Sequence, residues 1–114
     1  ALFERGLAAF ESEPLDNQWA SGASAAIEAE LQAGRVYRDF SDITFGPIEC
    51  RTQMCSLELR CAGEESLVRL DRRIRLATHR LRSAGYRFGL SLAVVSDPSG
   101  RGVLARYYLS TVRP

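Results

Sequence analysis

The sequence predicts an α+β fold, a two-layer sandwich in which a four-stranded, mainly antiparallel sheet carries two helices on one face. Two segments repeat apolar residues every three or four positions, as a helix buried along one side does. Four segments alternate apolar and polar residues, as half-buried strands do. The patterns follow one another in the order α-β-β-α-β-β, which favours helices packed against an antiparallel sheet.

The predicted domain spans residues 14–114 and is preceded by a lead-in segment, 1–13. Apolar residues of the lead-in recur at roughly helical spacing: Leu2, Phe3, Leu7 and Phe10. Glu13-Pro14 then interrupts the pattern. No linker or low-complexity run divides 14–114, so we expect it to fold as one unit.

The first predicted helix covers residues 14–34. Asp16 is suited to the N-cap, and Gly34 to the position that ends the helix. One side of the helix is apolar: Trp19, Ala23, Ala26, Ile27 and Leu31. Gly22 weakens the helix by ~1 kcal/mol relative to alanine, so packing of the apolar side must hold it.

The first predicted hairpin covers residues 42–61. Its first strand keeps its apolar residues on one side only if Gly46-Pro47 inserts a bulge. Its second strand alternates cleanly and places four residues on one face: Cys55, Leu57, Leu59 and Cys61.

The second predicted helix covers residues 63–85, where Gly85 ends an apolar stripe: Leu67, Leu70, Ile74, Ala77, Leu81 and Ala84. A second hairpin, 86–112, follows. Its first strand shares one apolar face: Tyr86, Phe88, Leu90, Leu92 and Val94. Asp97-Pro98-Ser99-Gly100 has the composition of its turn.

All three cysteines lie between residues 50 and 61. Cys50 and Cys55 flank a four-residue loop, and closing that loop places them opposite each other. Directly opposed Cα atoms in a hairpin are about 4.5–5.5 Å apart, within the range of a disulfide. We therefore predict a Cys50–Cys55 disulfide. The alternatives are three reduced cysteines in the cytosol, or a bond from Cys61 to one of the other two or to another chain.

The cysteine pattern does not favour a metal site or redox catalysis. The spacing lacks paired C-x₂-C motifs, and His79, the only histidine, lies on the second helix. C-x₄-C is also not the C-x-x-C motif of thiol oxidoreductases. A structural disulfide instead indicates an oxidising compartment, the periplasm or the cell exterior.

Two stretches, "FESEPLDNQWA" and "IECRTQMCSLELR", resemble bacterial extracytoplasmic small domains in which an acidic segment and a Trp helix precede a C-R-[ST]-x-x-C hairpin. The matching positions are Phe10, Glu13, Asp16, Trp19, Cys50, Arg51, Thr52 and Cys55. The resemblance covers less than half of the chain. It implies export and a paired Cys50 and Cys55, but no particular reaction, and Cys61 lies outside the pattern.

The sheet face that the two helices leave uncovered is the predicted partner-binding surface. Its predicted binding residues are Arg60, Arg87, Gly89, Ser91, Arg106 and Tyr108. Small residues in the third strand leave a shallow trough between arginines and a tyrosine, and glycine inside a strand often marks close approach by another group. The alternative is that this face accommodates the N-terminal segment 1–13, whose apolar residues must pack somewhere.

Charge is unevenly distributed, although the net charge is only +1. Residues 1–57 carry four arginines against nine acids, and residues 58–114 carry eleven against five. The second helix holds Arg69, Arg72, Arg73, Arg75, Arg80 and Arg82, which are either a solvated surface or a site for phosphates or an acidic partner. Because no aromatic residue lies beside them, the pattern argues against nucleic-acid binding.

The sequence carries no recognisable catalytic signature and implies no cofactor or metal. It lacks G-x-S-x-G and a phosphate-binding glycine loop, and His79 has no predicted acid or nucleophile beside it. No stretch approaches the ~20 apolar residues of a membrane span. All fifteen basic residues are arginine, which indicates a GC-rich bacterial genome. The chain starts at Ala1, so we expect a removed leader or a segment of a longer protein.

The leading hypothesis is a non-enzymatic, extracytoplasmic protein-interaction domain, pinned by the disulfide at its first hairpin. It would bind a protein partner or a second copy of itself through the open sheet face or the edge strands. One alternative is a small-molecule ligand-sensing domain of a larger envelope protein. The other is a nucleic-acid-associated domain that uses the Arg-rich second helix.

Overall fold

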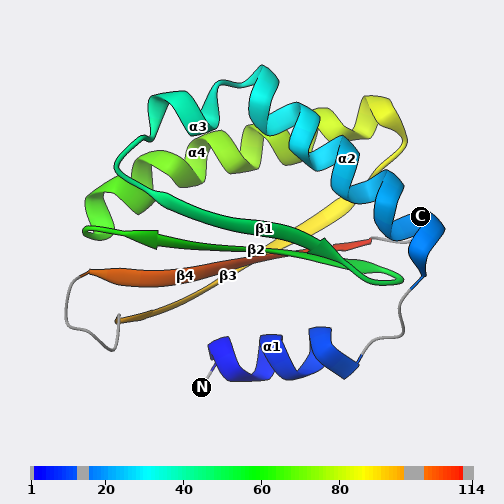
Figure 1. The fold of residues 1–114 in the computed structure, drawn as a ribbon, viewed down its shortest axis with the longest axis horizontal. Helices are drawn as coiled ribbons and strands as arrows, with labels where there is room; N and C mark the ends of the chain where they lie inside the picture. The colour runs from blue at the N-terminus through cyan, green and yellow to red at the C-terminus, as the bar shows by residue number, and fades with distance from the viewer. Residues whose placement is uncertain (1, 13–15, 97–101, 112–114) are drawn as a thin grey trace.

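The computed structural model describes residues 2–12, 16–96 and 102–111, and its fold is of the predicted α+β class. Four strands form one antiparallel sheet in the order β1-β2-β4-β3. They are β1 (Thr44–Cys50), β2 (Met54–Cys61), β3 (Phe88–Ser96) and β4 (Val103–Thr111). Two long helices, α2 (Asn17–Ala33) and α4 (Glu64–Arg80), cover one face of this sheet (Figure 1).

The helix α2 has the ends that the sequence predicts. The Asp16 side chain accepts a hydrogen bond from the backbone N–H of Trp19 (3.1 Å), and Gly34 caps the C-terminal end. Its buried stripe consists of Ala23, Ile27 and Leu31. A four-residue helix that the sequence pattern does not predict, α3 (Val36–Asp39), follows Arg35, which adopts a left-handed conformation.

The strands pair largely as predicted. The register of β1 against β2 shifts between Phe45 and Ile48, which confirms the bulge at Gly46-Pro47. The pairing of β3 with β4 runs without a shift from Phe88↔Thr111 to Ser96↔Val103. The predicted turn at 97–100 and the predicted boundary at 13/14 lie outside the described residues.

The helix α4 also follows its predicted stripe, except that Ala84, the last predicted member, is exposed in the turn after α4. Its buried apolar residues are Leu67, Leu70, Ile74 and Ala77. The chain continues as a short 3₁₀ helix, η1 (Leu81–Ala84), and Gly85 ends it with φ 91°, a conformation that glycine adopts without a steric penalty. The main core lies between α2, α4 and the sheet, and Tyr107 of β4 is fully buried in it.

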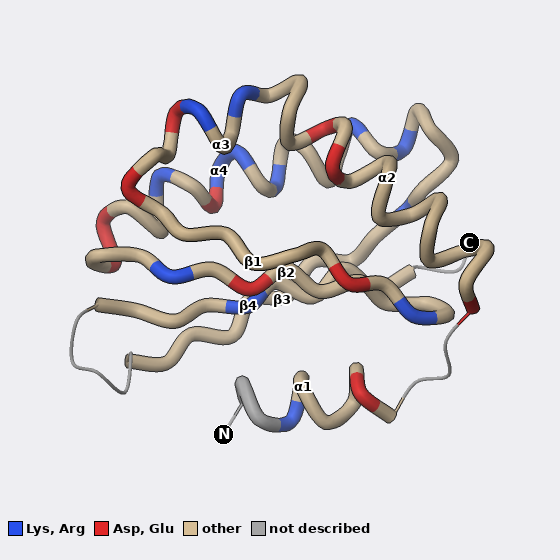
Figure 2. Tube along the Cα trace, in the orientation of Figure 1, with Lys and Arg blue, Asp and Glu red and all other residues tan. Residues whose placement is uncertain are grey.

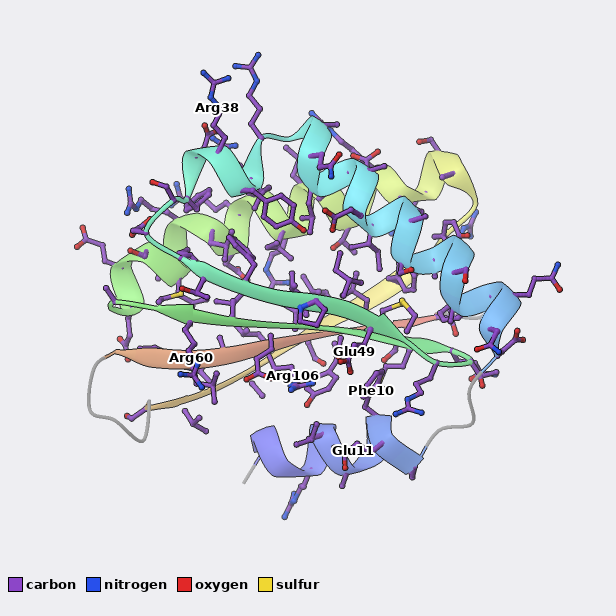
Figure 3. All side chains as sticks on the ribbon, in the orientation of Figure 1. Phe10, Glu11, Arg38, Glu49, Arg60 and Arg106 are labelled. Carbon is purple, nitrogen blue, oxygen red and sulfur yellow. A yellow bond between two sulfur atoms is a disulfide. The ribbon has the colours of Figure 1, made fainter. Side chains whose placement is uncertain are left out.

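The N-terminal helix α1 (Leu2–Ser12) lies against the opposite face of the sheet (Figure 1). Phe10 points from α1 toward the sheet and is only 1% exposed (Figure 3). Of the two interpretations of this face, the structure therefore shows the second, in which the N-terminal segment covers it. The side chains of Leu2 and Phe3 lie outside the described part of the chain.

Candidate functional site

Cys50 and Cys55 form a disulfide at the tip of the first hairpin, as predicted. They are directly paired across β1 and β2, with their Cα atoms 3.9 Å apart. The backbone N–H of Arg51 donates to the carbonyl of Met54 (2.8 Å) and closes the loop between them. The disulfide therefore fixes a tight loop at one end of the sheet.

Cys61 is the remaining cysteine, and it is a buried thiol. It is 3% exposed and takes no part in a disulfide. Burial, together with the nearby charge of Asp42, raises the pKa of this thiol. A thiol that is both buried and protonated is a poor nucleophile, so Cys61 is suited to core packing.

The disulfide-bonded tip contacts two other elements. The backbone N–H of Thr111, at the end of β4, donates to the carbonyl of Gln53 (2.9 Å). The Arg51 guanidinium lies 5.3 Å from the centre of the Phe10 ring, a cation–π distance. The tip thus ties the end of β4 and the helix α1 to the first hairpin.

Helix α1 approaches the sheet closely at Tyr108. Phe10, Ala93 and Tyr108 form a small buried cluster between the helix and the sheet. A Cβ atom on Gly6 would lie 2.5 Å from the Tyr108 ring, so glycine allows this approach. Burial raises the pKa of Tyr108, which is 4% exposed.

A charged pair lies on the same face of the sheet. The Arg106 guanidinium forms an ion pair with Glu58 and donates to the Ser56 hydroxyl (3.3 Å). Glu58, Arg106 and Ala93 are direct partners across three neighbouring strands, so the pair crosses the middle of the sheet. The Arg106 side chain is 12% exposed (labelled in Figure 3).

The structure brings four of the six predicted binding residues together on this face. Ser91 is paired directly with Tyr108, Gly89 lies two residues before Ser91, and Arg106 lies two residues before Tyr108. Helix α1 packs over this region and buries Tyr108. A partner could reach it in this arrangement only around or in place of α1.

The other two predicted residues lie apart from this group. Arg60 is paired with Leu104, whereas Arg87 precedes the pair Phe88↔Thr111. Along β4, the partner positions Leu104 and Thr111 are seven residues apart, which corresponds to about 23 Å along a strand. Arg60 and Arg87 are both exposed but do not form one surface patch. The binding role of all six residues stays a prediction.

The sheet has two outer strands, and they differ in how they could accept another strand. β1 is interrupted by the bulge at Gly46-Pro47, and Pro47 has no N–H to donate. β3 runs for nine residues without proline or a bulge and pairs on one side with β4. Among the described residues, no strand pairs with its other edge. Only β3 therefore offers a regular edge for strand pairing.

An open groove lies beside this edge, between β3 and α4. Its volume is about 260 Å³. Its lining residues are Arg75, Thr78, His79, Arg82, Phe88 and Leu90. The helix α4 and the following turn η1 contribute basic side chains, and the strand β3 contributes half-buried apolar ones. The groove thus has basic side chains on one side, Arg75, His79 and Arg82, which we call the basic wall, and the apolar edge of β3 on the other.

The charges of the groove are only partly neutralised within the protein. Arg75 forms an ion pair with Asp71 (2.7 Å), and Asp71 also accepts a hydrogen bond from the buried Tyr107 hydroxyl (2.7 Å). This hydrogen-bonded pair raises the pKa of Arg75. Within the described part of the chain, no carboxylate forms an ion pair with His79 or Arg82. Figure 2 shows further basic positions along α4.

The described residues show neither a metal site nor a membrane span. They contain no group of three or more histidine, cysteine or acidic residues that could hold a metal ion. None of their helices is both long and apolar enough to span a bilayer. Comparison with protein-family models, with curated proteins and with solved structures finds no match for the chain.

In the sequence, the Arg-rich helix and the sheet edges are separate candidate sites, and no local pattern combines them. Arg75, His79 and Arg82 are spaced by four and three residues, which places them on one helical face. This spacing could have identified the three residues as one basic surface. It could not have identified β3 as the neighbouring strand, because this depends on the strand order and on how α4 crosses the sheet.

Proposed function

We propose that this chain is a non-enzymatic protein-interaction domain that works outside the reducing cytosol and binds an extended segment of a partner along the outer edge of β3. The observation that carries this proposal is the regular nine-residue edge of β3 beside an open groove. An outer strand presents backbone N–H and C=O groups that a partner strand can pair with, which provides affinity without a deep pocket.

The β3 edge supports binding better than the sheet face does. The face is occupied by α1, whose Phe10 is almost fully buried there. A partner at that face would have to replace the apolar contacts of Phe10 and the close approach of Gly6 to Tyr108. A partner at the β3 edge adds contacts and displaces none of those described.

The disulfide supports the proposed compartment. Structural disulfides persist in oxidising surroundings and are rare in the cytosol. We expect protein isolated from its native source without reductant, then denatured, to be alkylated at Cys61 alone. Mass spectrometry counts the modified thiols. Three modified cysteines would contradict the proposed location.

Strand addition at β3 can be tested with peptides about nine residues long, the length of β3, that alternate valine with a polar residue. We expect titration into the ¹⁵N-labelled protein, up to millimolar concentration, to shift the amide resonances of residues 88–96 and to slow their hydrogen exchange. Binding this weak is still measurable, because a millimolar Kd corresponds to about 4 kcal/mol.

A pair of variants provides the control. Val94→Lys places a charge on the edge strand at a residue that is 43% exposed, and Leu76→Lys makes the matching change on α4 at a residue that is 47% exposed. We expect Val94→Lys to weaken peptide binding by roughly tenfold, because pairing would partly bury the ammonium group. Leu76→Lys should leave binding unchanged. Shifts confined to α1 or α2, or no shift with any peptide, would reject the proposal.

A further inference from the structure

We propose that the partner segment is acidic, with carboxylates at alternate positions that face Arg75 and His79 of α4 and Arg82 of η1. This inference rests on the proposed strand addition at β3 and adds the chemistry of the partner. Its basis is the position of these three side chains, which line the groove directly beside the strand edge.

The spacing of the three side chains matches that of a strand. The rise is ~6 Å from Arg75 to His79 along α4, and ~5 Å from His79 to Arg82, where the chain enters the 3₁₀ helix η1. Along a strand, side chains on the same face repeat every ~7 Å. Two or three alternate residues of an added strand would therefore pass the basic wall in succession. Their carboxylates would face the helix layer while the intervening residues point to the other face of the sheet.

The electrostatics of the groove favour carboxylates. Asp71 holds Arg75 in place through their ion pair and is itself held by the hydroxyl of Tyr107. A partner carboxylate could share Arg75 at its exposed side, because the Arg75 side chain is 56% exposed. Arg82 has no ion pair among the described residues and is exposed. An acidic side chain of the partner would supply the negative charge that pairs with Arg82.

The same charges argue against a second copy of the chain as the occupant. Two β3 strands that pair edge to edge around a two-fold axis would place both α4 helices on the same side of the joined sheet. The basic walls of the two grooves would then face each other. Like charges in such a position disfavour association, so the partner is better matched by an acidic segment of another protein.

The test compares three capped peptides that alternate valine with glutamate, with glutamine or with lysine, using the ¹⁵N-labelled full chain. We expect the glutamate peptide to bind at the β3 amides about tenfold more tightly than the glutamine peptide, because two or three exposed ion pairs each contribute up to ~1 kcal/mol. The lysine peptide should bind most weakly. Raising the salt from about 0.05 M to about 0.5 M should remove most of the difference.

Charge variants locate the effect. We expect Arg82→Gln to reduce the preference for glutamate over glutamine two- to fivefold, as the loss of an exposed ion pair worth up to ~1 kcal/mol implies, and to leave binding of the glutamine peptide unchanged. Arg69→Gln is the matched control, because Arg69 is an exposed arginine of α4 that does not line the groove. It should leave the preference unchanged.

The outcomes separate the two proposals. If all three peptides shift the β3 amides with equal affinity, strand addition stands and the acidic partner is rejected. If none shifts them, the β3 site itself is rejected. Two further results would also overturn the acidic-segment inference. One is dimerisation of the free chain through β3, and the other is a short DNA duplex that shifts the groove residues while the glutamate peptide does not.

Discussion

The fold favours the protonated forms of four buried or partly buried residues: Tyr37, Cys61, Tyr107 and Tyr108. The Tyr37 hydroxyl donates to Glu28 (2.7 Å), and the Tyr107 hydroxyl donates to Asp71 (2.7 Å). Burial, reinforced by these carboxylates, raises the pKa of both tyrosines, and burial also raises the pKa of the Cys61 thiol. These groups therefore make the stability of the protein depend on pH in the alkaline range.

The direction of that dependence follows from proton binding. As the pH rises past about 8.5, and then past about 10, the unfolded chain loses its cysteine and tyrosine protons before the folded protein does. The folded protein then binds more protons than the unfolded chain, so the free energy of unfolding falls as the pH rises. Below about pH 8 this contribution to stability is fully present.

We expect urea denaturation to show a constant contribution from these groups up to about pH 8 and a decline from there, steeper above about pH 10. Cys61→Ala should remove the decline in the free energy of unfolding that begins at about pH 8. Tyr37→Phe should reduce the steeper decline in the free energy of unfolding above about pH 10. A free energy of unfolding that rises between about pH 8 and 10, or a decline that neither variant alters, would contradict this explanation.

Among the described side chains of α1, Phe10 is the one that is buried against the sheet. We expect Phe10→Ala to lower the free energy of unfolding by up to ~3 kcal/mol and to speed hydrogen exchange in α1. The loss should be at the low end for a buried phenylalanine, because α1 can separate from the sheet while the main core stays intact. Hydrogen-exchange mass spectrometry of residues 2–12 measures this directly.

Glu11→Ala is the matched control for this change. Glu11 is the neighbouring residue on the same helix, but it is exposed. It should leave exchange in α1 and the stability nearly unchanged. Equal exchange in both variants and in the parent protein would show that Phe10 does not hold the helix.

The sequence predicted the elements well where a pattern extended over several turns or strand residues. The apolar stripes of α2 and α4 identified both helices, and Asp16 and Gly34 identified the ends of α2. The bulge at Gly46-Pro47 followed from the need to keep apolar residues on one side. The short helix α3 was missed because four residues cannot show a helical period.

The position of α1 and the groove could not be read from the sequence in the same way. A short helix with an apolar side can pack on any uncovered apolar surface. The sequence therefore left two possibilities for the second sheet face: a partner-binding surface, or a surface covered by residues 1–13. The groove needs the strand order β1-β2-β4-β3, which makes β3 an outer strand beside α4. Local patterns fix neither, because both arise from contacts between residues far apart in the chain.

At the scale of the whole molecule, the acidic first half and the basic second half of the chain meet in the helical layer. Arg73 of α4 forms an ion pair with Asp39 (3.0 Å) and donates to the carbonyl of Gly34 (3.0 Å). It also lies over the ring of Phe40. Part of the excess of arginine in α4 is thus matched within the protein, whereas the groove side of the helix is left with positive charge.

The strand order also decides when the sheet can form. β4 follows every other strand in the chain, yet it lies inside the sheet and joins β2 to β3. Before it is in place, the first hairpin and β3 share no backbone pairing. A polypeptide that leaves a ribosome or a translocation channel N-terminus first must therefore release this last strand before the four-stranded sheet can close.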